Sequence, residues 1–201
     1  TPESAKNIIG LGLKVCVEKN YATHLGINDD EYVKIGVEIK NSPNEIISSS
    51  NLITKVNCPN DDEIKILKDN TVLIGMLNPS KNKSQIEKII HKKIKPFSLE
   101  LLPRITRAQS MDVLSSQSNL AGYRAVVDCV AQFEKAVPMM MTAAGTVPAA
   151  KVLIIGAGVA GLQAIATAKR LGAIVSATDV RSASKEQVES LGGKFLTVEQ
   201  S

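Results

Sequence analysis

Short aliphatic runs alternate along the chain with segments in which apolar residues recur at helical spacing. The runs predict strands and the periodic segments predict helices. The predicted strands span residues 14–17, 37–39, 52–56, 71–77, 95–99, 152–155 and 173–178, with a further strand before Ser201. The predicted helices span residues 2–9, 29–35, 61–67, 84–91, 119–136 and 159–168, and a turn is expected at 41–44 around Pro43. Because strands alternate with helices, we expect an α/β fold with mostly parallel sheets.

The strand at 152–155 leads into a glycine-rich turn and then into an alanine-rich helix. Residues 156–161 read Gly-Ala-Gly-Val-Ala-Gly, the spacing G-x-G-x-x-G. In this motif the first glycine permits a tight turn, the second lets a pyrophosphate approach the main chain, and the third lets helix and strand pack closely. The N–H groups and the dipole at the helix start attract phosphate. The context predicts dinucleotide binding, and a glycine turn of another kind of α/β protein is the alternative.

An acidic residue follows the next strand, at 173–178. Asp179 stands close to the position, about 20 residues after the glycine motif, that is expected for the acid that holds the adenosine ribose. A carboxylate accepts from a 2′-hydroxyl and repels a 2′-phosphate, so Asp179 favours NAD over NADP. Arg181 leaves a second reading open, since an arginine here can receive that phosphate or can be a surface charge. The candidate cofactor-binding residues are Gly156, Ala157, Gly158, Val159, Gly161, Asp179 and Val180.

A polar stretch, residues 104–118, follows Pro103 and is dense in side chains that donate or accept hydrogen bonds. The segment after it, 119–136, has an apolar stripe at helical spacing. We therefore expect two Rossmann-like, doubly wound parallel-sheet domains. The first spans residues 1–136 and includes the polar stretch and the connecting helix. The second spans residues 137–201 and is truncated, being the N-terminal half of an NAD-binding domain.

Composition narrows the function classes. Hydrophobic residues make up 44% and charged residues 22% of the 201, which is typical of a folded protein. The net charge of +4 is mild and no basic cluster is interleaved with aromatic residues, so no nucleic-acid binding is expected. The three cysteines are scattered, which predicts neither a disulfide scaffold nor a metal site.

The chain gives no sign of a membrane span or a signal peptide. Residues 152–168 are apolar, but the run is shorter than the roughly 20 residues that a span needs and contains three glycines. The chain opens at Thr1 and ends at Ser201 just after a predicted strand, and we expect it to be a fragment of a longer protein.

Four segments carry a family resemblance that covers essentially the whole chain. They are Arg104-Ile-Thr-Arg-Ala-Gln-Ser-Met-Asp-Val-Leu-Ser-Ser, Asn119-Leu-Ala-Gly-Tyr-Arg-Ala, Thr142-Ala-Ala-Gly-Thr-Val-Pro and the glycine turn. With them the chain resembles the alanine dehydrogenase/transhydrogenase family, and within it the soluble NAD(H)-binding α-subunit component of proton-translocating NAD(P) transhydrogenases.

The resemblance implies NAD bound in a cleft between two domains, and a homodimer. It implies hydride transfer from NADH to NADP⁺ on a separate NADP(H)-binding component, coupled to proton movement by a membrane component. It further implies a cytoplasmic location, peripheral on the inner membrane through partner subunits. By analogy, Arg104 and Asp112 orient the nicotinamide, Ser115 hydrogen-bonds it, and Gln109 reaches toward the NADP-carrying partner.

Two other functions, and a purely structural role for the polar stretch, stay open at this point. An alanine dehydrogenase would use a lysine, matched by Lys55, and a histidine where Asn78 stands, and asparagine cannot take the proton. A non-catalytic NAD-sensing module would share the glycine turn but would not need the polar residues between Arg104 and Ser116. The polar stretch could also serve only to cap the following helix.

Overall fold

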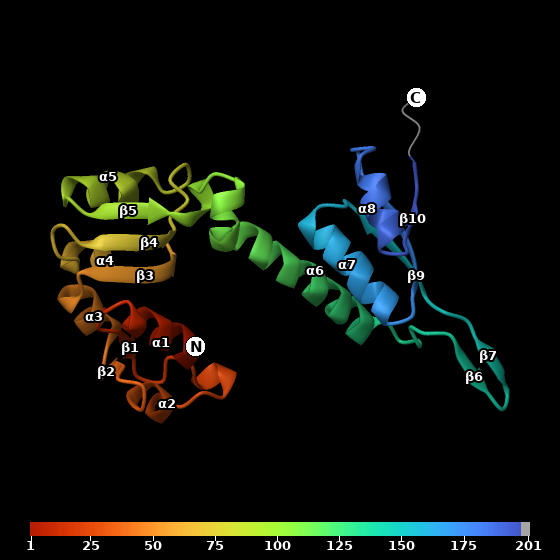
Figure 1. The fold of residues 1–201 in the computed structure, drawn as a ribbon, viewed down its shortest axis with the longest axis horizontal. Coiled ribbons are helices and arrows are strands. Elements are labelled where there is room, and N and C mark those ends of the chain that lie inside the picture. The colour runs from red at the N-terminus through yellow and green to blue at the C-terminus, as the bar shows by residue number, and fades with distance from the viewer. Residues whose placement is uncertain (198–201) are drawn as a thin grey trace. The chain divides into compact units, whose positions relative to one another are not determined.

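The chain folds into two compact units, each built on parallel strands (Figure 1). The computed structural model describes residues 1–197. The units are Thr1–Ile105 and Thr106–Ser201. The expected domain division between residues 136 and 137 stays a prediction, although the connecting helix lies in the second compact unit. The predicted α/β class with parallel sheets is confirmed.

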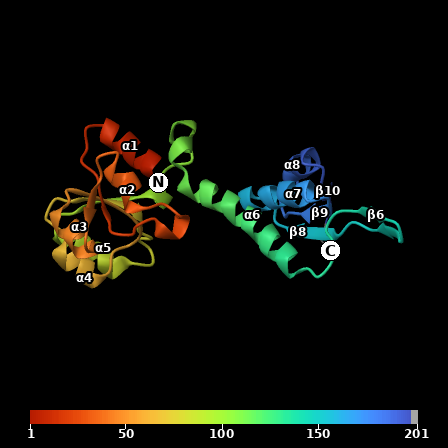
Figure 2. The ribbon, with the colours of Figure 1, turned by 90° about the horizontal axis from the view of Figure 1, so that it is seen from below.

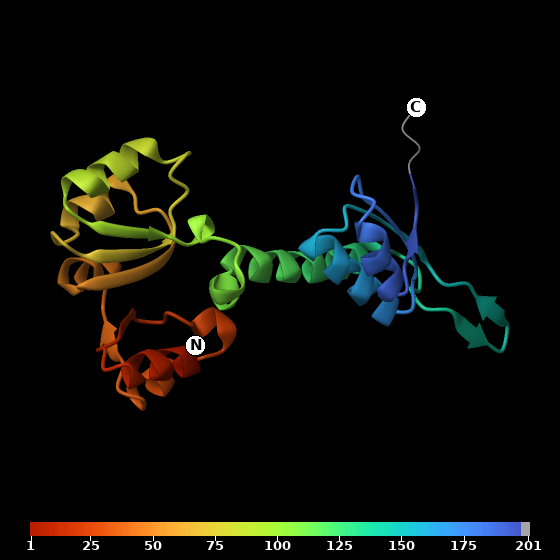
Figure 3. The ribbon, with the colours of Figure 1, turned by 45° about the horizontal axis from the view of Figure 1, so that its top comes forward.

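The first unit contains a three-stranded and a two-stranded parallel sheet. Its helices are α1 (Pro2–Gly10), α2 (Asp29–Val33), α3 (Pro43–Ser49), α4 (Asp61–Ile66) and α5 (Lys83–His91), with 3-10 turns η1 (Thr23–Leu25) and η2 (Leu99–Leu101). Its strands are β1 (Cys16–Glu18), β2 (Glu38–Lys40), β3 (Leu52–Asn57), β4 (Val72–Met76) and β5 (Lys95–Ser98). Strands β3, β4 and β5 pair in that order, and β1 pairs with β2 (Figure 3).

Local sequence signals and apolar burial together explain these elements. Thr1 caps α1 with Pro2 in its first turn, and Asn60 with Glu63 forms a capping box at α4. Leu73 in β4 and Ile89 in α5 are fully buried in one cluster, which joins the three-stranded sheet to its helices. A second cluster surrounds Tyr32.

The second unit contains the glycine turn. Its elements are η3 (Thr106–Met111), α6 (Val113–Gln132), β6 (Met140–Thr142), β7 (Gly145–Val147), β8 (Lys151–Ile155), α7 (Val159–Arg170), β9 (Ile174–Thr178), α8 (Ser184–Ser190) and β10 (Lys194–Phe195). The parallel sheet has the order β10-β9-β8, which matches the 3-2-1 half of a Rossmann sheet. Ile165, Val175 and Val188 are buried between this sheet and its helices.

Three sequence predictions were wrong in detail. The long helix was expected at 119–136 but spans Val113–Gln132, so most of the second half of the polar stretch is helical. The turn expected around Pro43 is the start of α3. Residues 139–150, for which no strand was predicted, include the antiparallel hairpin β6–β7 (Figure 2). In this hairpin Met140 pairs with Val147.

Candidate functional site

The glycine turn between β8 and α7 has the backbone geometry that its sequence predicts. Gly156 has a φ of 99°, a conformation that residues with a side chain rarely adopt. A Cβ on Gly161 would lie 1.8 Å from the carbonyl oxygen of Gly156, so the third glycine is required by contact within the turn. The N–H of Gly156 donates to the carbonyl of Thr178 at 2.8 Å, which ties the turn to the end of β9.

Gly158, at the start of α7, faces open space. A Cβ built on Gly158 would have no heavy atom within 4 Å among residues 1–197. No side chain in this described part of the chain caps α7, so the helix start offers main-chain N–H groups and the positive end of a dipole. These features fit a phosphate group that approaches the backbone.

Asp179 follows β9 and is bonded to the glycine turn. Its Oδ2 accepts from the N–H of Ala157 at 2.7 Å, and its Oδ1 accepts from the N–H of Arg181 at 2.8 Å. The Arg181 guanidinium also donates to this carboxylate, which is only 6% exposed. The guanidinium and these two N–H groups hold the pKa of Asp179 well below its usual range, so the acid stays ionised near neutral pH. Val180, beside it, is fully exposed.

Asp112 and Ser115 lie together at the start of α6. Asp112 is the N-cap: Oδ1 accepts from the N–H of Ser115 at 2.9 Å, and Oδ2 accepts from its hydroxyl at 2.7 Å. Both side chains are half-buried. The capping role that the sequence left open is therefore real for this pair.

Helices α6 and α7 run side by side (Figures 1 and 2). Their packing fixes the position of the polar start of α6 relative to the glycine turn at the start of α7. A Cβ on Gly122 in α6 would lie 2.0 Å from the carbonyl oxygen of Ala160, so the backbones nearly touch at the start of α7. Further along, Gly172 lies against Pro138, beyond the end of α6. The helices therefore run in the same direction. Asp112 precedes Gly122 by ten residues, so the polar start of α6 projects about 15 Å past the glycine turn.

The other two predicted residues are Arg104, expected at the nicotinamide, and Gln109, expected to reach toward the NADP-carrying partner. Arg104 belongs to the first unit and Gln109 to the second, and both are exposed. The carbonyl of Gln109 accepts from the N–H of Asp112 at 3.2 Å, so Gln109 is fixed through its backbone next to the cap.

Sequence reasoning missed two carboxylates at the carboxyl edge of the β3–β4–β5 sheet. Lys55, named for the alanine dehydrogenase alternative, pairs with Glu63 at 2.6 Å. Asn78, just past β4, has a φ of 45° and donates its N–H to Glu100. The sequence could have indicated both, because Glu63 stands in the first turn of a predicted helix and Glu100 directly follows a predicted strand. Gly122 was also missed, although a glycine inside a helical pattern often marks close packing.

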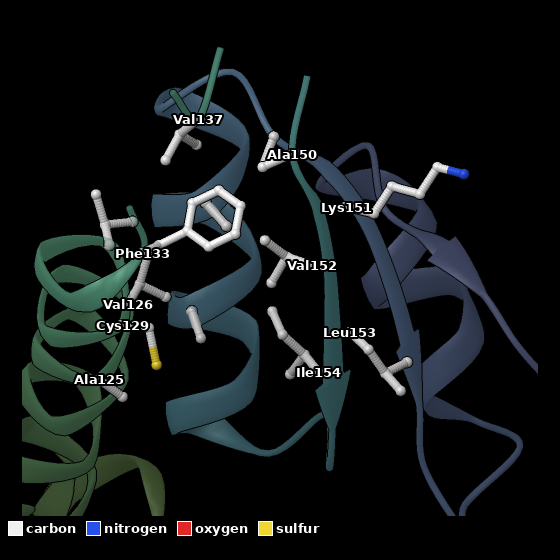
Figure 4. Close-up of a pocket in the computed structure, with 14 residues that line it drawn as sticks. Ala125, Val126, Cys129, Phe133, Val137, Ala150, Lys151, Val152, Leu153 and Ile154 are labelled. Carbon is white, nitrogen blue, oxygen red and sulfur yellow. The ribbon is translucent and has the colours of Figure 1, made fainter. Parts of the chain in front are cut away.

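An apolar cavity of about 340 Å³ lies between α6 and β8. Side chains of Phe133, Val152 and Ile154 face it (Figure 4). Its lining offers little for hydride chemistry, and it belongs to the packing of the helix on the sheet. Among residues 1–197 no His, Cys, Asp and Glu side chains gather in threes as metal ligands, and no helix there has the length and hydrophobicity to cross a membrane.

The fold and the glycine turn are those of a Rossmann-type α/β protein with a dinucleotide-binding motif. Residues 1–121 match the model of the alanine dehydrogenase/PNT N-terminal domain, and residues 125–201 match that of the C-terminal domain. The chain therefore belongs to the alanine dehydrogenase/PNT family.

The individual proteins that resemble this chain are transhydrogenases and an alanine dehydrogenase. An NAD(P) transhydrogenase subunit alpha polypeptide of Rhodospirillum rubrum is 52% identical over 204 residues, which cover 99% of this chain and 53% of that protein. The crystal structure of transhydrogenase from Sinorhizobium meliloti superposes with a TM-score of 0.92 at 51% identity, over 98% of this chain and 59% of that one. An L-alanine dehydrogenase structure shares the fold, with a TM-score of 0.81 at 24% identity over 99% of this chain and 56% of that one. The chain spans about half the length of the curated relatives it matches.

Proposed function

We propose that this chain is the NAD(H)-binding portion of an NAD(P) transhydrogenase. In this proposal it takes part in hydride transfer between NADH and NADP⁺ held by a separate NADP(H)-binding component, and a membrane component couples the transfer to proton movement. The support is the name carried by relatives about half identical to this chain, together with the geometry of the second unit.

One observation carries the proposal: the glycine turn at the start of α7 and the polar start of α6 lie toward the same end of two helices that pack side by side. Gly158 opens α7 toward free space, and Asp179 is bonded to the same turn. The Asp112 cap projects about 15 Å beyond that turn. A dinucleotide held by its pyrophosphate at Gly158 and by its adenosine ribose at Asp179 would extend its nicotinamide along α6. Asp112 and Ser115 would then orient that ring together with Arg104, and Gln109 would face the partner.

The residue types suit this chemistry. When bound, NADH supplies the hydride, and transfer between two nicotinamides needs neither a protein base nor a metal. The protein has to hold the ring at a fixed place and angle, because misplacement of the reacting atoms slows the transfer strongly. The Asp112 carboxylate is held by two bonds from Ser115, and a rigid acceptor of this kind can fix the ring's carboxamide.

The contacts of Lys55 count against the alanine dehydrogenase alternative. That reaction needs a cation for the substrate carboxylate and a proton acceptor. The Lys55 ammonium is already paired with Glu63, and Asn78 stands where the proton acceptor is expected. The NAD-sensing alternative is separated from transhydrogenation by the test below, because sensing requires binding without transfer.

We further propose a homodimer on the cytoplasmic side of the membrane, attached through its partner components. The hairpin β6–β7 supports the dimer, because an isolated two-stranded hairpin is at best marginally stable. Its Met141 is 84% exposed and Met140 is 41% exposed. Such a hairpin gains stability when a second copy covers it.

The test compares two replacements of Asp112 in the full-length protein. Asparagine is as good an N-cap as aspartate, so Asp112→Asn removes the charge and keeps the helix start. We expect hydride transfer from NADH to an NADP⁺ analogue, with the partner component present, to fall at least about tenfold. NADH binding should change little, because most of the proposed contacts lie at the glycine turn.

Asp112→Ala is the matched control for the cap itself. It should lose the same transfer activity and in addition lose about 0.5–2 kcal/mol of stability, measured by urea unfolding. Unchanged hydride transfer in Asp112→Asn would rule out the proposed role of this carboxylate.

A further inference from the structure

The carboxylate of Asp179 has all of its acceptor positions occupied by the chain itself. A carboxylate offers about four lone-pair sites. Oδ1 accepts from the N–H of Arg181 at 2.8 Å and from its Nε at 3.0 Å. Oδ2 accepts from the N–H of Ala157 at 2.7 Å and from Nη2 of Arg181 at 3.1 Å. The side chain of Asp179 is 6% exposed, and the guanidinium of Arg181 is in direct contact with it.

These four bonds fall into two kinds: the two main-chain bonds can remain when a nucleotide binds to Asp179, and the two guanidinium bonds cannot. The two main-chain bonds come from the glycine turn and from the backbone after Asp179, and they fix the direction of the carboxylate. The two guanidinium bonds come from a side chain that is 62% exposed. Ribose hydroxyls need acceptor sites on the solvent side of the same carboxylate. Those are the sites that the guanidinium fills.

We propose that Arg181 is a built-in competitor of the adenosine ribose: its guanidinium occupies the ribose-binding face of Asp179 and has to leave when NAD(H) binds. This inference rests on the proposed NAD(H) site and deepens it. It also gives Arg181 a role different from the two readings that the sequence left open. While Asp179 is present, the guanidinium is held by the acid and does not act as a receptor for a 2′-phosphate. Without Asp179 the same guanidinium is released to bind one.

The first test measures NADH binding to the full-length protein by nucleotide fluorescence. Arg181→Leu removes the competitor, and Lys185→Leu is the control, because it removes an equal charge from an exposed lysine four residues on. We expect Arg181→Leu to bind NADH about two- to fivefold tighter than Lys185→Leu at low ionic strength, the range for an ion pair at the protein surface. Arg181→Lys, which keeps the charge but loses the two-point contact, should fall between wild type and Arg181→Leu.

The salt dependence of NADH affinity distinguishes an electrostatic competitor from a residue with a merely structural role. The advantage of Arg181→Leu should shrink between about 10 mM and 1 M salt, where the screening length falls from about 30 Å to 3 Å. Arg181→Leu that binds NADH no more tightly than Lys185→Leu at low salt would overturn the inference and leave the proposed function standing. A wild-type protein that binds no NADH would overturn both.

The second test uses NADPH. Asp179→Ser should bind NADPH at least about tenfold tighter than wild type, because the released guanidinium pairs with the 2′-phosphate. Adding Arg181→Leu to Asp179→Ser should remove that gain, which a double-mutant cycle measures directly. An equal gain with and without Arg181 would show that loss of the acid alone changes the preference, and the competitor role would be rejected.

Discussion

Two glycines on either side of the start of α7 are constrained for different reasons. Gly161 meets the carbonyl of Gly156, and Gly158 meets only open space. Gly158 has a φ of −78°, which any residue can adopt. We expect Gly161→Ala to lose about 1–3 kcal/mol of stability through overpacking. Gly158→Ala should unfold at the wild-type urea concentration but bind NADH at least about tenfold more weakly, because its methyl group keeps the pyrophosphate off the backbone.

The pair of variants carries its own control. Urea unfolding followed by circular dichroism reports on Gly161, and NADH titration reports on Gly158. If Gly158→Ala bound NADH as tightly as wild type, the turn would not be the phosphate site. If Gly161→Ala were as stable as wild type, the close contact with Gly156 would be relieved by a shift that costs little.

The residues of this turn could be predicted because glycine spacing reports backbone geometry directly. Gly156, Gly161 and the acid after the next strand follow from local rules about turns and helix starts. The pairing of Arg181 with Asp179 could not be predicted. A guanidinium two residues after an acid can fold back onto it, receive a phosphate or point into solvent, and local sequence does not choose among these.

At the scale of elements, the packing of α6 on α7 decides where the polar cap lies. Gly122 permits this packing, since a Cβ there would lie 2.0 Å from the carbonyl oxygen of Ala160. We expect Gly122→Ala to push the helices apart and to lose about 1–3 kcal/mol of stability. Transfer activity should fall more than NADH affinity, because the cap at Asp112 would move relative to the glycine turn.

Gln117→Ala is the matched control on the same helix, at an exposed position. It should change the free energy of unfolding by no more than about 0.5 kcal/mol. In an isolated helix alanine is favoured over glycine by about 1 kcal/mol. A more stable Gly122→Ala would therefore mean that propensity outweighs the contact with Ala160.

Two elements show why strand and helix boundaries were only partly predictable. The sequence Ser42-Pro43-Asn44-Glu45 is a helix start, in which Ser42 accepts from the N–H of Glu45, but proline between polar residues is equally typical of a turn. In α6, the serine residues after Asp112 have modest helix propensity, so the segment up to 118 resembles a loop. The N-cap bonds of Asp112 and the packing of the helix on α7 extend it to Val113. Tertiary packing of this kind is invisible to a local pattern.

At the scale of the whole molecule, the exposed hairpin β6–β7 bears on the proposed homodimer. Met139, Met140 and Met141 form a run of exposed apolar side chains, and methionine adapts well to a partner surface. The hairpin is a small antiparallel pair apart from the parallel sheet of its unit. A covering surface would remove these side chains from water at a gain of about 25 cal/mol per Å².

We therefore expect Met140→Lys with Met141→Lys to shift the full-length protein from dimer to monomer in sedimentation velocity. Two lysine charges buried in a dimer interface would lose hydration without partners, which costs several kcal/mol. Gln187→Lys, at an exposed position of α8, adds a charge elsewhere and should leave the dimer intact. The double variant should keep the circular dichroism of wild type, because both methionines are exposed within this chain. A double variant that still sediments as a dimer would place the interface on another surface.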